Sequence, residues 1–109
     1  MIKVPELSEK PTLGELQFHL QKVCELRGWD KHSISEVFLL FSEEIGELAK
    51  DIRKFTGFKG EKPTDSTDQL SSELADVLNY LMEIANRFGV DLETAYRQKQ
   101  ATNASREWK

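Results

Sequence analysis

Two short acidic stretches carry the side chains best suited to chemistry in this sequence. Glu44 and Glu47 stand three positions apart, and Glu73 and Asp76 repeat that spacing further along the chain. Residues three apart are neighbours on one face of an α-helix, so each stretch would present a pair of carboxylates. Such pairs are common on solvated helix surfaces, and one pair alone is weak evidence for a site. Two pairs together hold enough oxygen ligands for a magnesium ion.

The orientation of the two pairs favours one shared site. Each helical residue advances by about 100°, which places Glu44 about 70° and Glu47 about 130° from the centre of the apolar face of their helix. Glu73 and Asp76 have about the same offsets on the same flank of theirs. If the two helices pack antiparallel with their apolar faces together, these flanks meet and the four carboxylates converge. Glu43 lies outside the flank, and we favour a surface position for it over a supporting role.

The four carboxylates would need a cation to lie close together. Converging carboxylates repel one another, and each raises the pKa of its neighbours. Mg²⁺ relieves the repulsion, prefers oxygen ligands, and takes water or substrate phosphate oxygens as its remaining ligands. The absence of a nearby histidine argues against zinc. It also argues against the di-iron bundle proteins, which use Glu-x-x-His pairs.

The acidic pairs require two long helices, and the sequence predicts four helices in all. Apolar residues recur at helical spacing, and no stretch alternates with the period of two that is typical of a strand. Capping boxes at Thr12 and Ser33 begin the first two helices, and Asp91 caps the last. The predicted helices run from Thr12 to near Gly28, from Ser33 to Gly57, from about Thr67 to Phe88, and from Leu92 to about Glu107.

The composition is that of one small soluble domain. With 109 residues, of which 39% are hydrophobic, the chain can bury a modest core. Its net charge of −4 argues against binding to nucleic acid, which requires a basic face. The single cysteine, Cys24, excludes an intrachain disulfide, and we place it in the core. With no signal peptide and no apolar run of membrane-spanning length, we expect a cytoplasmic protein without a membrane partner.

The segments outside the helices divide the chain into an arm, a loop and one domain. We expect residues 1–11, which are polar and contain prolines, to form a flexible N-terminal arm. Residues 12–109 would form the folded domain. Residues 56–66 contain glycine, proline and lysine and are predicted to form a long loop between the two acidic helices. The sequence supports a functional loop and a solvated connection equally.

The acidic stretches belong to a longer pattern that resembles a known enzyme family. Glu43-Glu44-x-x-Glu47 is followed, after a spacer, by Glu73-x-x-Asp76 and Val77-Leu78-x-Tyr80-Leu81. This order resembles the signature of the MazG-like, all-α nucleoside triphosphate pyrophosphohydrolases, which include dCTP pyrophosphatases, dimeric dUTPases and phosphoribosyl-ATP pyrophosphohydrolases. The likeness extends over nearly the whole chain. Further matches are the connector Leu26-Arg27-Gly28-Trp29 and the C-terminal element Lys99-x-x-x-Asn103 with Arg106.

The resemblance implies a reaction and a set of metal ligands. Enzymes of this kind cleave between the α and β phosphates of a nucleoside triphosphate and release the monophosphate and pyrophosphate. Carried over by motif, Glu44, Glu47, Glu73 and Asp76 would bind Mg²⁺, with Mn²⁺ as a substitute. One of these carboxylates, for which we choose Glu47, would also orient or deprotonate the attacking water as the catalytic residue.

The resemblance also assigns residues to the substrate. Lys99 and Arg106 would offset the charge of the triphosphate, and Asn103 would donate hydrogen bonds. The spacing of these three residues places them on one face of the last helix. Trp29 would either stack on the base or fill the core at a helix end. Tyr80 lies on the acidic flank and would border the pocket.

The apolar faces are broad for a chain this short, and one helix pair leaves the acidic cleft open on its outer side. We therefore expect an all-α, four-helix bundle-like fold of the MazG type that is completed by oligomerisation. The resemblance implies a homo-oligomer, either a dimer or a tetramer made of two dimers.

These observations lead to one principal hypothesis for the function. It is Mg²⁺-dependent hydrolysis of (deoxy)nucleoside triphosphates as house-cleaning of the nucleotide pool, with pyrimidine deoxynucleotides such as dCTP as candidate substrates. A phosphoribosyl-ATP pyrophosphohydrolase or a dUTPase is the alternative within the same enzyme class. A non-catalytic helical interaction module is the alternative from another class. The four-carboxylate set argues against that module, because an unused acidic cluster carries an electrostatic cost.

Overall fold

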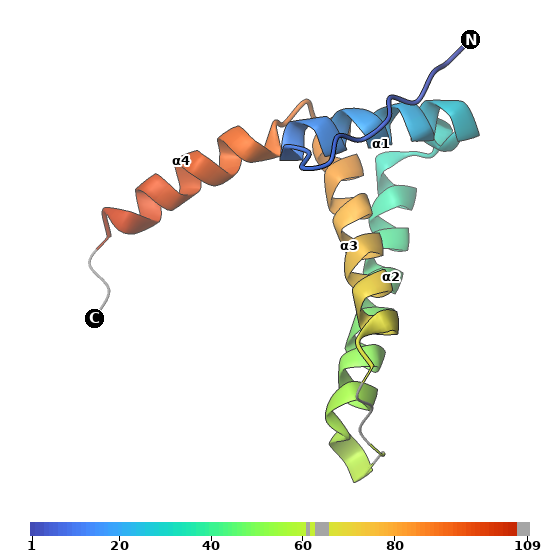
Figure 1. The fold of residues 1–109 in the computed structure, drawn as a ribbon, viewed down its shortest axis with the longest axis vertical. Coiled ribbons are helices and arrows are strands. Elements are labelled where there is room, and N and C mark those ends of the chain that lie inside the picture. Colours follow the sequence, from blue (N-terminus) through green and yellow to red (C-terminus); the bar gives the residue numbers. More distant parts are fainter. Residues whose placement is uncertain (61, 63–65, 107–109) are drawn as a thin grey trace. The chain divides into compact units, whose positions relative to one another are not determined.

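All regular secondary structure in the part that the structure describes is helical. The computed structural model describes residues 1–60, 62 and 66–106, and these contain no strand, which confirms the predicted all-α class. None of the described helices is long and apolar enough to cross a membrane. The elements are α1 (Leu13–Arg27), η1 (Trp29–Lys31), α2 (Ile34–Thr56), η2 (Phe58–Gly60), α3 (Asp68–Arg87) and α4 (Leu92–Ala104) (Figure 1).

Two reciprocal caps begin α1 and α2, as the sequence predicts. The hydroxyl of Thr12 accepts a hydrogen bond from the backbone N–H of Glu15, and the Glu15 carboxylate accepts one from the N–H of Thr12. Ser33 and Glu36 repeat this arrangement at the start of α2. Each box satisfies backbone donors that the first turn of a helix leaves without partners.

The C-terminal ends of α1 and α2 agree with the predicted stops at Gly28 and Gly57, whereas those of α3 and α4 differ from the prediction. Gly28 ends α1 in the left-handed conformation, with a φ of 74°, where glycine carries no steric cost. The third helix ends one residue before the predicted Phe88. The last helix ends at Ala104 because Ser105 caps it, and the predicted end at Glu107 lies outside the described residues.

The segment between α2 and α3 is described only in part. Its first residues form η2, in which Lys59 adopts a left-handed φ of 66°. Lys62 and Ser66 are also described. The predicted loop at residues 56–66 otherwise falls on residues 61 and 63–65, which lie outside the described part.

The chain divides into two compact units. The first contains residues 1–31 and the chain from Ala85 onward, and the second contains residues 32–84. The predicted metal ligands all belong to the second unit, whereas Trp29 and the C-terminal basic residues belong to the first.

In the first unit, a buried glutamine on α1 forms hydrogen bonds with the segment that leads into α4. Gln17 is 6% exposed, and its side-chain amide donates to the carbonyl of Val90 at 2.9 Å and to Asn86 at 3.0 Å. Its carbonyl oxygen accepts a hydrogen bond from the backbone N–H of Leu92 at 2.9 Å. These bonds fix the turn before α4 against α1. Cys24, one of the most buried residues of α1, occupies the core position that the sequence predicts.

The second unit is an antiparallel pair of helices. α2 and α3 run side by side in opposite directions (Figure 1). Val37 is 1% exposed and is the most deeply buried large side chain of this pair. Much of the remaining apolar surface faces outward, with exposed fractions between 39% and 66%. The exposed apolar residues of the pair are Phe38, Leu39, Ile45, Ile52, Leu74, Leu78 and Leu81.

A candidate metal centre on two neighbouring helices

The structure brings together three of the four predicted metal ligands. Glu44 on α2 and Glu73 and Asp76 on α3 each offer one carboxylate oxygen, and these oxygens all lie within 4.8 Å of one another. Glu44 and Glu73 are half-buried at the border between the helices. The antiparallel pairing that we expected from the positions around each helix therefore brings these three carboxylates close together.

Glu47, the fourth predicted ligand, is not a member of this carboxylate group. It is exposed, one turn after Glu44 along α2. The angle of about 130° from the apolar face is not the reason, because Asp76 joins the group at about the same angle; the rotation and axial register of α2 against α3 decide which carboxylates meet. Its proposed roles as ligand and as catalytic residue stay predictions.

Within the carboxylate group, the pKa of Glu73 is raised well above its ordinary value. A hydrogen bond with Glu44, partial burial and the negative charges of Glu44, Asp51 and Asp76 raise the pKa of Glu73 to about 7. A raised pKa of this origin means that, below about pH 7, one carboxyl group of the pair holds a proton in the protein without a metal ion. The second oxygen of Glu73, Oε2, is buried and has no hydrogen-bond partner.

The carboxylate group fits a divalent, oxygen-preferring cation. All of its donors are carboxylate oxygens, as Mg²⁺ prefers, and few enough to leave positions for water or phosphate. A cation would also replace the shared proton and provide Glu73 Oε2 with a partner. Glu44, Glu73 and Asp76 are therefore able to hold a divalent cation.

Tyr80 lies one turn after Asp76 on α3, near enough for the charges of Glu44 and Asp76 to act on it, and its predicted place beside the substrate pocket stays a prediction. Burial raises the pKa of its phenol, and the negative charges of Glu44, Glu83, Asp76 and Glu43 raise it further. The hydroxyl therefore stays protonated at neutral pH and is available as a hydrogen-bond donor beside the acidic group.

Trp29, predicted to bind the base or to fill the core, lies in the first unit. The residue is 44% exposed, and the guanidinium of Arg27 lies over its ring, 5.4 Å from the ring centroid. Its backbone carbonyl accepts a hydrogen bond from Arg87 at 3.3 Å. The ring is therefore on the surface of this unit, with one face against a cation.

The C-terminal basic element differs from its predicted geometry. Lys99 and Asn103 lie on α4, four residues apart and on one face. Arg106 lies beyond the end of the helix, so the prediction that all three share a helical face is wrong. The Ser105 hydroxyl donates to the carbonyl of Thr102 at 2.7 Å, and this bond satisfies a terminal carbonyl where the helix stops.

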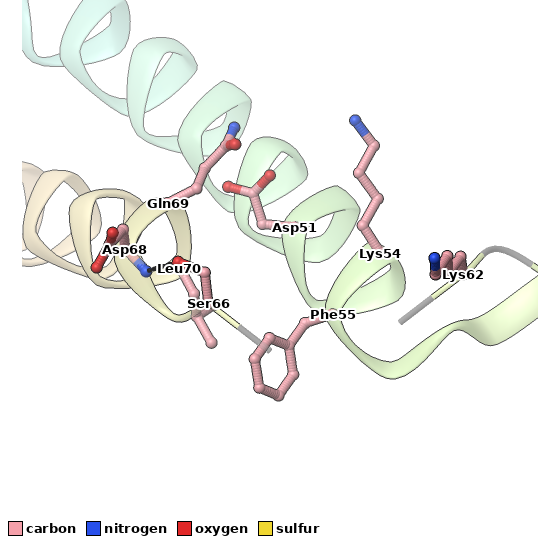
Figure 2. A pocket seen from close by; sticks show the side chains of 8 residues that line it. All are labelled: Asp51, Lys54, Phe55, Lys62, Ser66, Asp68, Gln69 and Leu70. Atoms are coloured by element: carbon pink, nitrogen blue, oxygen red, sulfur yellow. Dashed lines mark hydrogen bonds between the residues drawn. The ribbon is translucent and has the colours of Figure 1, made fainter. Parts of the chain in front are cut away.

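Sequence reasoning missed Asp51. This residue is 6% exposed, and its carboxylate lines a pocket of about 590 Å³ between α2 and the start of α3 (Figure 2). Its negative charge contributes to the raised pKa of Glu73. The sequence feature that could have identified Asp51 is its position seven residues, or about two turns, after Glu44. This spacing places both side chains on the same face of α2.

Comparison with known proteins gives three related findings. The pattern of the MazG nucleotide pyrophosphohydrolase domain matches residues 30–106. Human dCTP pyrophosphatase 1 is 34% identical over 105 residues, and the mouse protein of that name is 35% identical over 104. Each of these matches covers 91% of this chain but 61% of the relative, so the chain spans less than two thirds of their length. The uncharacterized protein YpjD of Bacillus subtilis (strain 168) is 36% identical over 55 residues, half of each chain.

Proposed function

The chain belongs to the MazG nucleotide pyrophosphohydrolase family, and on that premise we propose that it hydrolyses nucleoside triphosphates to the monophosphate and pyrophosphate. The observation that carries the proposal is the convergence of Glu44, Glu73 and Asp76 inside the region that the family pattern matches. Attack on a phosphate anhydride requires positioning and charge neutralisation more than covalent chemistry by the protein. A group of carboxylates that can hold a cation meets the second requirement.

Mg²⁺ is the proposed cofactor, with Mn²⁺ as a substitute. When bound, the ion neutralises phosphate charge, polarises the bonds to phosphorus and makes nearby water more acidic. Glu44, Glu73 and Asp76 would hold it. Glu47 remains in the proposed ligand set, and it is our choice for the carboxylate that orients the attacking water and accepts its proton.

Other side chains of this protein are proposed to bind the substrate. Lys99 and Arg106 would offset the charge of the triphosphate, and Asn103 would donate hydrogen bonds to its oxygens. The protonated hydroxyl of Tyr80 would donate a hydrogen bond next to the acidic group. Trp29, with a ring on the surface of the first unit, stays a proposed substrate-binding residue rather than a core residue.

We propose pyrimidine deoxynucleotides, and dCTP first among them, as the preferred substrates. The support is the 34% identity to proteins named dCTP pyrophosphatase 1 over most of this chain. A dUTPase and a phosphoribosyl-ATP pyrophosphohydrolase are the alternatives. A homo-oligomer, either a dimer or a tetramer, is the proposed assembly because of the exposed apolar residues on α2 and α3.

A substrate panel tests the proposed function. Each of the four deoxynucleoside triphosphates, dUTP and phosphoribosyl-ATP would be incubated with the protein, with and without Mg²⁺, and pyrophosphate release measured. We expect turnover with Mg²⁺, fastest for dCTP, and none with EDTA. Release of inorganic phosphate instead of pyrophosphate, or no turnover of any nucleotide at micromolar protein, would contradict the proposal.

The same assay tests the role of Glu47. Glu47→Gln keeps the size of the side chain but removes its ability to accept a proton, and we expect kcat to fall by at least about 100-fold. Glu43→Gln is the matched control, since it removes an exposed carboxylate one turn before Glu47 on α2. We expect its turnover to be close to that of the unmodified protein. Equal rates for the two variants would exclude Glu47 from the mechanism.

A further inference from the structure

A pocket lies further along the same two helices, away from the carboxylate group. Its walls include Asp51, Lys54 and Phe55 from α2 and Gln69 and Leu70 from α3 (Figure 2). Its volume of about 590 Å³ is within the range of small-molecule sites. Phe55 and Leu70 are half-buried and give it apolar surface, and the other three side chains give it polar groups.

The unusual group in this pocket is the carboxylate of Asp51. The residue is 6% exposed, and its Oδ2 atom is buried without a hydrogen-bond partner. A buried acceptor without a donor opposes folding, and native proteins seldom keep one unless it has another role. In a pocket of this volume, the missing donor is one that a bound molecule can supply.

The distance from this carboxylate to the metal-binding group suits a single nucleotide. Asp51 follows Glu44 by seven residues, which is about 10 Å along α2. On the opposite helix, Gln69 precedes Glu73 by four residues, which is about 6 Å in the same direction. Asp51 is also close enough for its charge to act on Glu73. A nucleotide with its phosphates at the carboxylate group can therefore extend its sugar along the helices and its base into the pocket.

We propose that Asp51 reads the exocyclic amine of the nucleobase and thereby selects amine-bearing nucleotides. A carboxylate accepts hydrogen bonds and donates none, so it pairs with the N4 amine of cytosine or the N6 amine of adenine. Uracil and hypoxanthine place a carbonyl oxygen at the corresponding position, where it would face the carboxylate without a proton between them. This specificity role rests on the proposed function, because it assumes that the phosphates bind at Glu44, Glu73 and Asp76.

Two neighbouring side chains complete the recognition. The amide of Gln69 can donate to the ring nitrogen beside the amine, which is an acceptor in cytosine and adenine but carries a proton in uracil and hypoxanthine. The ring of Phe55, one turn after Asp51, offers an aromatic wall to the face or edge of the base. The combined pattern of one acceptor and one donor distinguishes the amine-bearing bases from the others.

The test uses substrates that differ at this one position. The ratio of kcat/KM for dCTP to that for dUTP, and for dATP to that for dITP, would be measured with the full chain and with Asp51→Asn. An amide presents a donor as well as an acceptor, so we expect both ratios to fall by about 10- to 100-fold, toward one. Glu43→Gln is the matched control, because it removes the same charge from an exposed residue of α2 that does not line this pocket, and we expect it to keep the native ratios.

Each other outcome of this test contradicts either the inference or the proposed function. Unchanged ratios in Asp51→Asn, or an equal loss for both members of each substrate pair, would overturn the role of Asp51 in specificity. If the protein hydrolyses no triphosphate, calorimetric binding of dCMP and dUMP separates the two proposals. Tighter binding of dCMP that Asp51→Asn abolishes would retain the inference and reject the proposed function. Equal binding of dCMP and dUMP, or no binding of either, would overturn both.

Discussion

At the scale of single residues, the chemistry of the acidic site depends on how Glu73 exchanges a proton for a cation. Its carboxyl group shares a hydrogen bond with Glu44 and lies near the charges of Asp51 and Asp76, which raises its pKa to about 7 from the usual 4.5. The folded protein therefore binds a proton at Glu73 across a pH range in which the unfolded chain has released it.

Because Glu73 binds this proton in the folded state, we expect the stability of the metal-free protein to depend on pH. Between about pH 4.5 and pH 7 the folded state holds more protons than the unfolded state, so the free energy of unfolding falls as the pH rises through this range. The favourable contribution is complete below about pH 4.5 and is lost as the pH passes 7. Thermal melting in EDTA at pH 5, 6, 7 and 8 would measure the effect.

Glu73→Gln provides the comparison for this pH dependence. The amide cannot ionise, so we expect the decline between pH 5 and pH 7 to become smaller, whereas Glu43→Gln should retain it. We also expect Mg²⁺ to bind more tightly at pH 8 than at pH 6, because the ion must displace the proton. Identical pH profiles for the protein and Glu73→Gln would mean that another group carries the titration.

At the scale of elements, α2 presents Glu44 at the site because its start is fixed by local bonds. The capping box at Ser33 and Glu36 sets the first turn, and every later residue follows at a constant angle. The left-handed Gly57 ends the helix after Thr56. The positions of Glu44 and Asp51 on one face follow from this regular geometry.

Removing the cap should therefore cost stability without changing the chemistry of the site. Ser33→Ala deletes the hydroxyl that accepts from the N–H of Glu36, and we expect a loss of about 1 kcal/mol in the free energy of unfolding, measured in urea. Ser42→Ala is the control on the same helix. Its hydroxyl donates to the carbonyl of Phe38 in mid-helix, and its removal should change stability by less than about 0.5 kcal/mol. A larger loss for Ser42→Ala than for Ser33→Ala would refute the capping argument.

At the scale of the whole molecule, the exposed apolar residues of the α2–α3 pair require an explanation. Leu39 is 66% exposed and Phe38 is 58% exposed, and both lie near the start of α2. Apolar side chains grouped on one pair of helices commonly mark a contact with another protein. A second copy of this chain is the partner that we propose.

A charge placed in this apolar surface should separate the subunits. We expect the native protein to show the mass of a dimer or tetramer in light scattering, and Leu39→Glu to show a smaller mass at the same concentration. Leu26→Glu, at a residue that is 55% exposed on α1, is the control and should retain the native mass. A monomeric native protein, or dissociation by the α1 variant alone, would place the interface elsewhere or remove it.

The sequence by itself determined the helices and the acidic pairs that they carry. Helix formation depends on interactions between residues three and four apart and on caps a few residues long, so the signals at Thr12, Ser33 and Asp91 were readable without tertiary information. The three residues Glu44, Glu73 and Asp76 were predicted for the same reason, because their angle to the apolar face follows from helical geometry. The resemblance to MazG-like enzymes was visible in these motifs, and the family membership is confirmed.

The tertiary structure decided what local geometry leaves open. Which carboxylates meet depends on the rotation and axial register of α2 against α3, and packing of whole helices sets both. That register brings Glu44, Glu73 and Asp76 within 4.8 Å and leaves Glu47 exposed outside the group. It also buries Asp51, whose unpartnered oxygen could be found only once the opposite helix and its pocket were in place. Burial of a polar atom is a property of the packed helices and not of the sequence pattern of either one.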